Sequence, residues 1–169
     1  NAVKTDPGND LVCRTERQTP DFQEAAEITR AAVWRTPKLL ILEMEVLRAP
    51  KEDPLTDIFL TYYWLINVDG DLSTGRQDDR SGTELIIRLT KQAVVWQVHV
   101  EYFGEAGGRH LDLNSYFEVS DNSAAIYLPL DKLPVKFSPA ATWHGAAVID
   151  SIKGRGSQSC FDKIGDPAE

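Results

Sequence analysis

Two carboxylates, Asp69 and Asp71, stand two positions apart in the stretch DGDLSTG, directly after a run of strand-forming residues. With Ser73 they match the first, third and fifth ligand positions of an EF-hand-like calcium loop. The match then ends, because the glycine falls one position late at Gly75 and the twelfth position is Arg80 instead of Glu. The stretch therefore predicts either a looser calcium loop at a strand end or a solvated turn between strands.

Further carboxylates could complete such a calcium site, because Ca²⁺ prefers several oxygen ligands. Asp78 follows the loop closely enough to return to it, and the opening sequence DPGND supplies Asp6 and Asp10. The predicted ligands of Ca²⁺, the only cofactor that we expect, are Asp69, Asp71, Ser73, Asp78, Asp6 and Asp10.

Other patterns typical of catalysis or metal binding do not occur in the sequence. The histidines lack HxH or HExxH spacing, so zinc is not predicted, and neither CxxCH nor GxSxG is found. Glu43 and Glu45 share one side of an expected strand, where they would pair with outward arginines such as Arg30 or Arg88. We therefore expect a protein that is not an enzyme.

The overall charge narrows the classes of partner. A net charge of −8 disfavours nucleic acid and anionic membrane surfaces, and it suits calcium or a neutral glycan better. No apolar run is long enough to span a membrane, so we expect no membrane insertion. Because the chain of 169 residues starts at Asn1 without an initiator Met, we expect a mature secreted protein after signal removal.

The two cysteines, Cys13 and Cys160, lie near opposite ends of the sequence in polar surroundings. In a secreted protein an even count at such positions predicts one disulfide that joins the two ends of the chain. The alternative is a pair of buried free thiols in a cytosolic protein.

Hydrophobic residues recur with a period near two along most of the chain, which indicates β-strands. About eight or nine strands joined by short turns predict an antiparallel, jelly-roll-like β-sandwich in the all-β class. Residues 1–21 are polar and rich in turn formers, so we expect an N-terminal arm packed on one domain of residues 22–169. The expected strands cover residues 27–35, 38–47, 57–68, 83–90, 93–103, 115–120, 123–130 and 140–150.

The same alternation predicts the sides and turns of these strands. In 38–47 we expect an inward side of Leu40, Leu42, Met44 and Val46, and in 27–35 one side made of Ile28, Arg30, Ala32 and Trp34. Hairpin turns are expected at Lys91-Gln92 and Asp121-Asn122, and a turn without a strand at residues 104–110. Residues 153–159 are expected to lead to the second cysteine.

The apolar run 57–68 places Tyr62 and Trp64 on one face of a central strand and Tyr63 on the other. Because one face must be core, the other would present rings that stack on the apolar C–H faces of sugars or form a subunit interface. The alternative is that a loop or the arm covers them. The predicted carbohydrate or interface residues are Tyr63, Trp64 and Trp143.

The opening DPGND, a tryptophan-bearing strand, and a strand that runs into DGDLSTG before SGTELIIRL resemble certain secreted bacterial β-sandwich domains. The resemblance covers residues 6–90 and is to family 9 carbohydrate-binding modules, DOMON-type domains and the glucodextranase C-terminal domain. It implies an extracellular sandwich, often attached to carbohydrate-active or surface proteins, with calcium in its loops. Carried over, the implied calcium ligands are Asp6, Asp10, Asp69 and Asp71. Two positions depart from the pattern: Glu84 replaces the second Asp of the later motif, and Asn9 stands beside Asp10.

The sequence as a whole predicts a secreted, calcium-stabilised, non-catalytic β-sandwich module that binds carbohydrate or cell-surface material. The alternative is a structural subunit of an extracellular filament or surface layer. Such a subunit would self-assemble through the arm 1–21 and an apolar sheet face.

Overall fold

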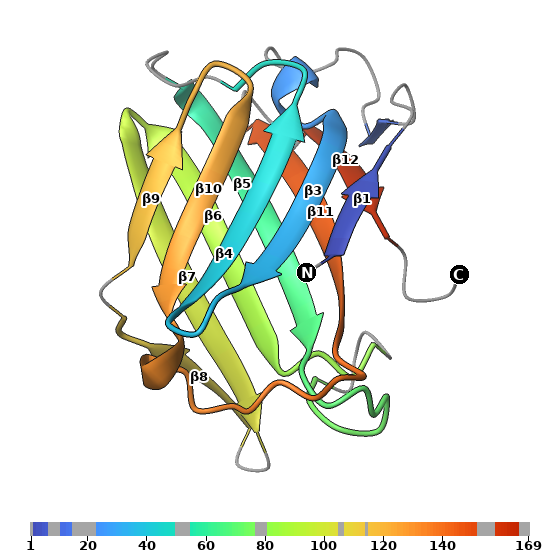
Figure 1. Cartoon of the computed structure of the whole chain (residues 1–169). Coiled ribbons are helices and arrows are strands. Elements are labelled where there is room, and N and C mark those ends of the chain that lie inside the picture. Colours follow the sequence, from blue (N-terminus) through green and yellow to red (C-terminus); the bar gives the residue numbers. More distant parts are fainter. Residues whose placement is uncertain are drawn as a thin grey trace.

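A computed structural model describes residues 2–6, 11–14, 23–49, 55–76, 81–104, 107–113, 115–151 and 158–165. They form two antiparallel β-sheets that pack face to face (Figure 1), which confirms the predicted β-sandwich. The five-stranded sheet has the order β1 (Ala2–Thr5), β3 (Ile28–Arg35), β4 (Leu39–Val46), β10 (Ser123–Pro129) and β9 (Tyr116–Val119). The seven-stranded sheet has the order β2 (Val12–Arg14), β12 (Gln158–Ile164), β11 (Thr142–Ser151), β5 (Leu55–Asn67), β6 (Leu85–Ala93), β7 (Val95–Gly104) and β8 (Gly107–Leu111).

Two 3₁₀ turns, η1 (Gln23–Ala25) and η2 (Leu130–Lys132), are the helical elements of the described residues. None of the described helices has the length and apolar character needed to cross a membrane.

The core between the sheets follows from the period-two pattern of the strands. In β4 every second side chain is buried, as predicted, and these side chains are Leu40, Leu42, Met44 and Val46. The facing positions of β10 continue this aliphatic layer with Ala124, Ile126 and Leu128. The seven-stranded sheet contributes the largest buried rings, Tyr62 and Trp64 of β5. β5 is central, as predicted, although only its inner face is fully buried.

A β-bulge in β3 lies between Ile28 and Arg30. A bulge adds one residue to a strand and so reverses which side the later residues face. Ile28 is fully buried before the bulge, whereas the core side after it consists of Ala31 and Val33. Trp34 therefore points away from the core, and the prediction that it shares a side with Ile28 is wrong.

The hairpin turns were predicted in one case and misplaced in the other. Antiparallel pairing of β9 with β10 confirms the turn at Asp121-Asn122. The β6–β7 turn lies at Ala93-Val94, just beyond the facing pair Gln92 and Val95, so the predicted turn is two residues early. Ala93 has a φ of 52°, a conformation for which an alanine gives no sequence signal.

Four short strands were missing from the predicted set. β8 replaces part of the turn expected at 104–110, and β12 follows the strand that was expected to be the last. The described parts of the arm form β1, which pairs with β3, and β2, which pairs with β12. The arm thus provides one edge strand to each sheet of its own chain.

The disulfide between Cys13 and Cys160 is present, as predicted. The two residues face each other directly in the β2–β12 pair, with their Cα atoms 4.0 Å apart. Because they are 147 positions apart in sequence, the bridge holds the short edge strand β2 against the end of the chain.

Candidate functional site

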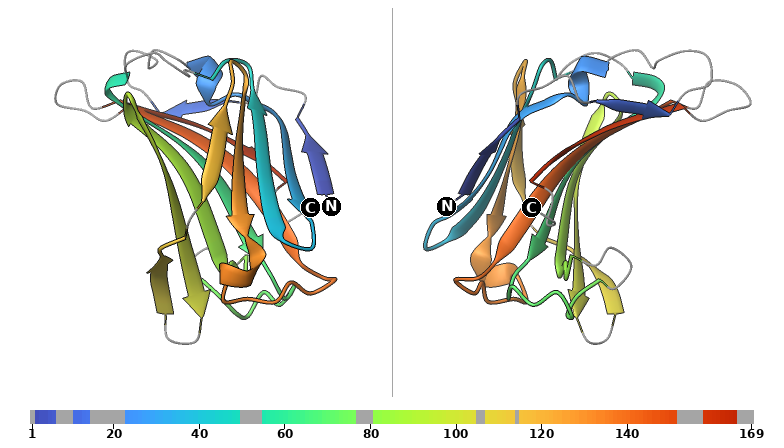
Figure 2. Two further views of the ribbon diagram at one scale, coloured as in Figure 1. Left: turned by 60° about the vertical axis from the view of Figure 1, so that its left-hand side comes forward. Right: turned by 90° about the vertical axis from the view of Figure 1, so that its right-hand side faces the viewer.

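The Asp69 loop, residues 69–76, leaves the end of β5 at one end of the sandwich, beside the connection between β10 and β11 (Figure 2). A carboxylate oxygen of Asp69 accepts the Asp71 N–H at 2.7 Å. One oxygen of Asp71 accepts both the Ser73 N–H at 2.8 Å and its hydroxyl at 2.7 Å. These bonds from Ser73 hold the pKa of Asp71 below its usual value. Two successive side-chain-to-backbone turns therefore shape the loop.

The Thr74 hydroxyl lies within hydrogen-bonding distance of several acceptor oxygens. Both carboxylate oxygens of Asp69 are 3.2 Å away, the Asp71 carbonyl oxygen is 2.9 Å away, and Glu84 Oε1 is closer still. Glu84 is buried, and its other oxygen accepts the Val68 N–H at 2.7 Å. Since a hydroxyl carries one hydrogen, the loop gathers more acceptors here than this group can satisfy.

The structure brings together only part of the predicted calcium set. Asp69, Asp71 and Ser73 share the loop, whereas Asp6 donates its N–H to the carbonyl of Thr29 at the start of β3. That position is about 20 Å along β3 from the end of the sandwich that holds the loop, so Asp6 does not share a site with Asp69. Asp78 and Asp10 lie outside the described residues. In the part of the chain that the structure describes, no three His, Cys, Asp or Glu residues group in a way that could hold a metal ion.

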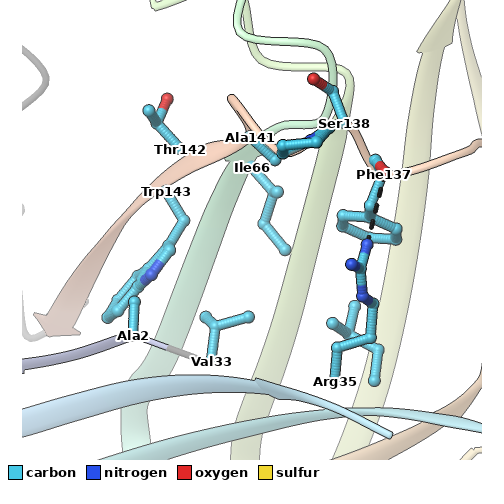
Figure 3. A pocket seen from close by; sticks show the side chains of 11 residues that line it. Ala2, Val33, Arg35, Ile66, Phe137, Ser138, Ala141, Thr142 and Trp143 are labelled. Carbon is cyan, nitrogen blue, oxygen red and sulfur yellow. Dashed lines mark hydrogen bonds between the residues drawn. The ribbon is translucent and has the colours of Figure 1, made fainter. Parts of the chain in front are cut away.

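The predicted ligand-binding rings occupy three different environments. Trp64 is 0% exposed, and its indole N–H donates across the core to the Glu43 carbonyl at 3.3 Å. Trp143 is 8% exposed and forms a wall of a pocket between the sheets (Figure 3). Only Tyr63 lies on an outer face, where it is half-buried opposite Arg88. Trp64 is thus a core residue with no surface for a ligand, which corrects the prediction for it.

A row of aromatic side chains crosses the outer face of the five-stranded sheet. Strand register places Trp34, Ile41, Tyr127 and Tyr116 directly opposite one another on β3, β4, β10 and β9. We call these four residues the aromatic row. Because neighbouring strands lie about 4.8 Å apart, the row extends about 14 Å across the face. Tyr116 is 60% exposed, and its ring centroid lies 5.6 Å from that of Tyr127.

Carboxylates flank the aromatic row on the same face. Glu43 accepts the Trp34 indole N–H at 2.9 Å, and Glu118 accepts the hydroxyls of Tyr116 at 3.0 Å and of Tyr127 at 3.3 Å. The bond to Glu118 and its negative charge raise the pKa of Tyr116. The pKa of Tyr127 is raised by burial and by Glu118. The hydroxyls therefore remain protonated donors at neutral pH.

An ion pair lies next to these carboxylates. Arg30 binds Glu45 at 2.7 Å and approaches Glu43 to 3.7 Å, which is the pairing with an outward arginine that the sequence predicted. The face therefore combines apolar ring surfaces with fixed donors and acceptors.

The sequence analysis did not identify Trp34, Tyr116 and Tyr127 as candidates. The bulge reversed the side of Trp34, and β9 has only four residues over which an alternation could be recognised. A signal was present for Tyr127, because the buried alternation of Ala124, Ile126 and Leu128 in β10 leaves Tyr127 on the opposite side.

Comparison with known proteins yields no relative for this chain. No protein-family model matches the sequence, and no curated protein matches it significantly. The arguments for function therefore rest on the geometry described above.

Proposed function

We propose that this protein is a non-catalytic binding module that recognises a carbohydrate chain with the outer face of its five-stranded sheet. The aromatic row is the observation that carries the proposal. Aromatic rings present apolar faces that pack against the C–H faces of sugars, and their polar edges bind hydroxyl groups. An exposed row about 14 Å long, three strand spacings wide, suits an extended chain of sugars better than a single small molecule.

The flanking carboxylates support binding rather than reaction in this proposal. Glu43 and Glu118 already accept hydrogen bonds from the indole and phenol groups of the row. Each carboxylate oxygen has a second lone-pair site, so it can accept a further bond from a sugar hydroxyl. The carboxylates thereby fix the rings and add polar specificity to the same face.

An extracellular location is part of the proposal. Disulfides persist in oxidising compartments and are rare in the cytosol. The Cys13–Cys160 bridge between an edge strand and β12 supports a secreted protein that meets glycans or cell-surface material outside the cell.

Affinity electrophoresis in gels that contain soluble polysaccharides would test the proposal. The wild-type chain should be retarded by at least one polysaccharide of a varied panel. Trp34→Ala should weaken binding about tenfold, as truncation of a central aromatic contact does at interfaces. Tyr63→Ala is the matched control, because it removes an aromatic side chain from the outer face of the other sheet.

The outcomes of this experiment separate the site from the function. Retardation that is lost in Tyr63→Ala but kept in Trp34→Ala would move the site to the seven-stranded sheet. No retardation by any polysaccharide or insoluble glycan would reject carbohydrate binding.

We also propose that Ca²⁺ stabilises the Asp69 loop. The excess of acceptors around the Thr74 hydroxyl supports this, because a cation would neutralise the facing oxygens of Asp69 and Glu84. The Asp71 carbonyl and the Thr74 hydroxyl are neutral oxygen donors in the same place. Ca²⁺ should raise the melting temperature of the wild type relative to chelator but not that of Asp69→Asn. An equal melting temperature in both conditions would contradict a calcium site.

The predicted alternative, a filament or surface-layer subunit, requires the arm to pair with a neighbouring molecule. In this chain β1 and β2 already pair with β3 and β12. Light scattering with and without Ca²⁺ tests the alternative, since a binding module should remain monomeric in both. Large particles that disappear on deletion of residues 1–12 would support the filament subunit instead.

A further inference from the structure

A pocket of about 170 Å³ lies between the two sheets, at the end of the sandwich that also carries the Asp69 loop. Figure 3 shows the rings of Trp143 and Phe137 on opposite sides of it, with Ile66 and Val33 between them. An apolar cavity of about 150 Å³ is large enough to hold benzene. The pocket therefore has room for one aromatic ring or an aliphatic group of similar size.

The polar groups around the pocket are mostly hydrogen-bond donors. Arg35 is the only charged residue among the described lining residues, and no carboxylate lines the pocket. The Ser138 hydroxyl oxygen accepts the Ala140 N–H at 3.0 Å, so its own hydrogen points elsewhere. In a chain of net charge −8, a pocket with one cation and no acid favours an anion.

Arg35 is positioned by weak contacts that a ligand could replace. Its guanidinium lies 5.7 Å from the centre of the Phe137 ring and donates to the Phe137 carbonyl over a long 3.4 Å. A carboxylate accepts two parallel bonds from a guanidinium, which are shorter and stronger than one long bond to a carbonyl. The side chain is exposed, so a ligand can reach it without opening the core.

Trp143 adds an independent sign that this wall is prepared for a ligand. Its indole N–H is buried without a hydrogen-bond partner among the described residues. Such a donor costs free energy unless it is satisfied. On one face of the ring lies Lys4 Nζ, 4.8 Å from the ring centre, which also donates to the Trp143 carbonyl at 2.6 Å.

We propose that this pocket binds a small organic carboxylate, with its apolar body between Trp143 and Phe137 and its carboxylate on Arg35. The site is separate from the aromatic row. Val33 and Arg35 line the pocket, whereas Trp34 between them points away from the core on the same strand. The two sites can therefore be occupied independently.

Benzoate is a suitable probe, because its ring matches the size of the pocket and its carboxylate matches Arg35. Titration followed by protein NMR shifts should show saturable binding, with the largest changes at residues that line the pocket. Benzamide has nearly the same shape without the charge, and it should bind at least about tenfold more weakly, since a charge-assisted pair is lost.

Two variants and one control assign the site. Arg35→Gln should weaken benzoate binding about tenfold while the melting temperature stays unchanged, because the side chain is exposed. Val33→Phe should block binding by filling the pocket with a ring. Arg109→Gln removes an exposed cation from β8, at the edge of the other sheet, and should leave binding unchanged.

Three results would overturn the proposal. The first is the absence of saturable benzoate binding to the wild type. The second is equal affinity for benzoate and benzamide. The third is an Arg35→Gln variant that binds benzoate as tightly as the wild type.

Discussion

The seven-stranded sheet turns Trp64, Trp96 and Trp143 toward the core, whereas the five-stranded sheet turns Trp34 toward the surface. The inner face of the five-stranded sheet is instead mostly aliphatic, as β4 and β10 show. One sheet thus supplies the large rings that fill the interior. This division leaves most of the aromatic side chains of the other sheet available for a surface.

The difference depends on strand geometry more than on residue type. Alternation along a strand assigns each side chain to a face, and one inserted residue reverses the assignment. The bulge between Ile28 and Arg30 does this for Trp34. A tryptophan can therefore be a core residue or a surface residue depending on a feature several positions away from it.

The largest expected effect concerns the anchored edge of the seven-stranded sheet. Cys13→Ser with Cys160→Ala should lower the free energy of unfolding by up to about 5 kcal/mol, because a long loop is no longer closed in the unfolded chain. Denaturant unfolding measures this loss, and hydrogen exchange should show β2 and β12 opening before β4 and β10. A loss below about 1 kcal/mol would mean that the bridge adds little to the pairing of β2 with β12.

A pair of tryptophan variants tests the comparison directly. Trp64→Ala should cost about 3–5 kcal/mol, because it empties a fully buried site. Trp34→Ala should cost less than about 1 kcal/mol, because a half-exposed ring leaves no closed cavity. Chemical denaturation of both variants measures these values. Similar losses would show that Trp34 is as important to the fold as Trp64, and the comparison of the sheets would fail.

A pair of tyrosine variants separates the two faces by a single hydroxyl group. The Tyr62 hydroxyl is buried without a hydrogen-bond partner among the described residues, and burial raises its pKa. Tyr62→Phe should therefore stabilise the protein by about 1 kcal/mol. Tyr127→Phe should destabilise it by about 0.5 kcal/mol, since the bond to Glu118 is lost at the surface. Destabilisation by Tyr62→Phe would reveal a partner for that hydroxyl.

The smallest expected effect is a shift in titration on the outer face. Glu118→Gln should lower the pKa of Tyr116 toward its ordinary value, because the hydrogen bond and the negative charge raise it. A raised tyrosine pKa favours folding at a pH below the unfolded value of 10.0, and this contribution disappears as the pH rises through the folded pKa. Ultraviolet absorbance during alkaline titration measures the shift. An unchanged titration curve would contradict the contact with Glu118.

Much of the fold could be predicted because its central strands alternate regularly. β4 and the β9–β10 hairpin follow directly from that pattern, and the disulfide followed from two cysteines near the chain ends. β1, β2 and β8 have five residues or fewer, too few to show an alternation. Their place depends on neighbours that are distant in sequence.

The candidate sites were harder to predict for a related reason. The local spacing of Asp69 and Asp71 indicated a polar loop, but Glu84 reaches it from the start of the next strand. Likewise the aromatic row joins Trp34 and Tyr116 from strands far apart in the sequence. Such groupings arise from register between strands, which a pattern within one strand does not contain.

The Cys13–Cys160 bridge also determines how the domain would respond to mechanical force. Tension applied before Cys13 and after Cys160 would pass through a covalent bond instead of through the hydrogen bonds of the sheets. The pull could peel β1 from β3 and the end of β12 from β11, but residues 14–159 would carry no load. Trp34, Tyr127 and Tyr116 all lie within that shielded segment, so the aromatic row would keep its shape while the ends of the chain are under strain.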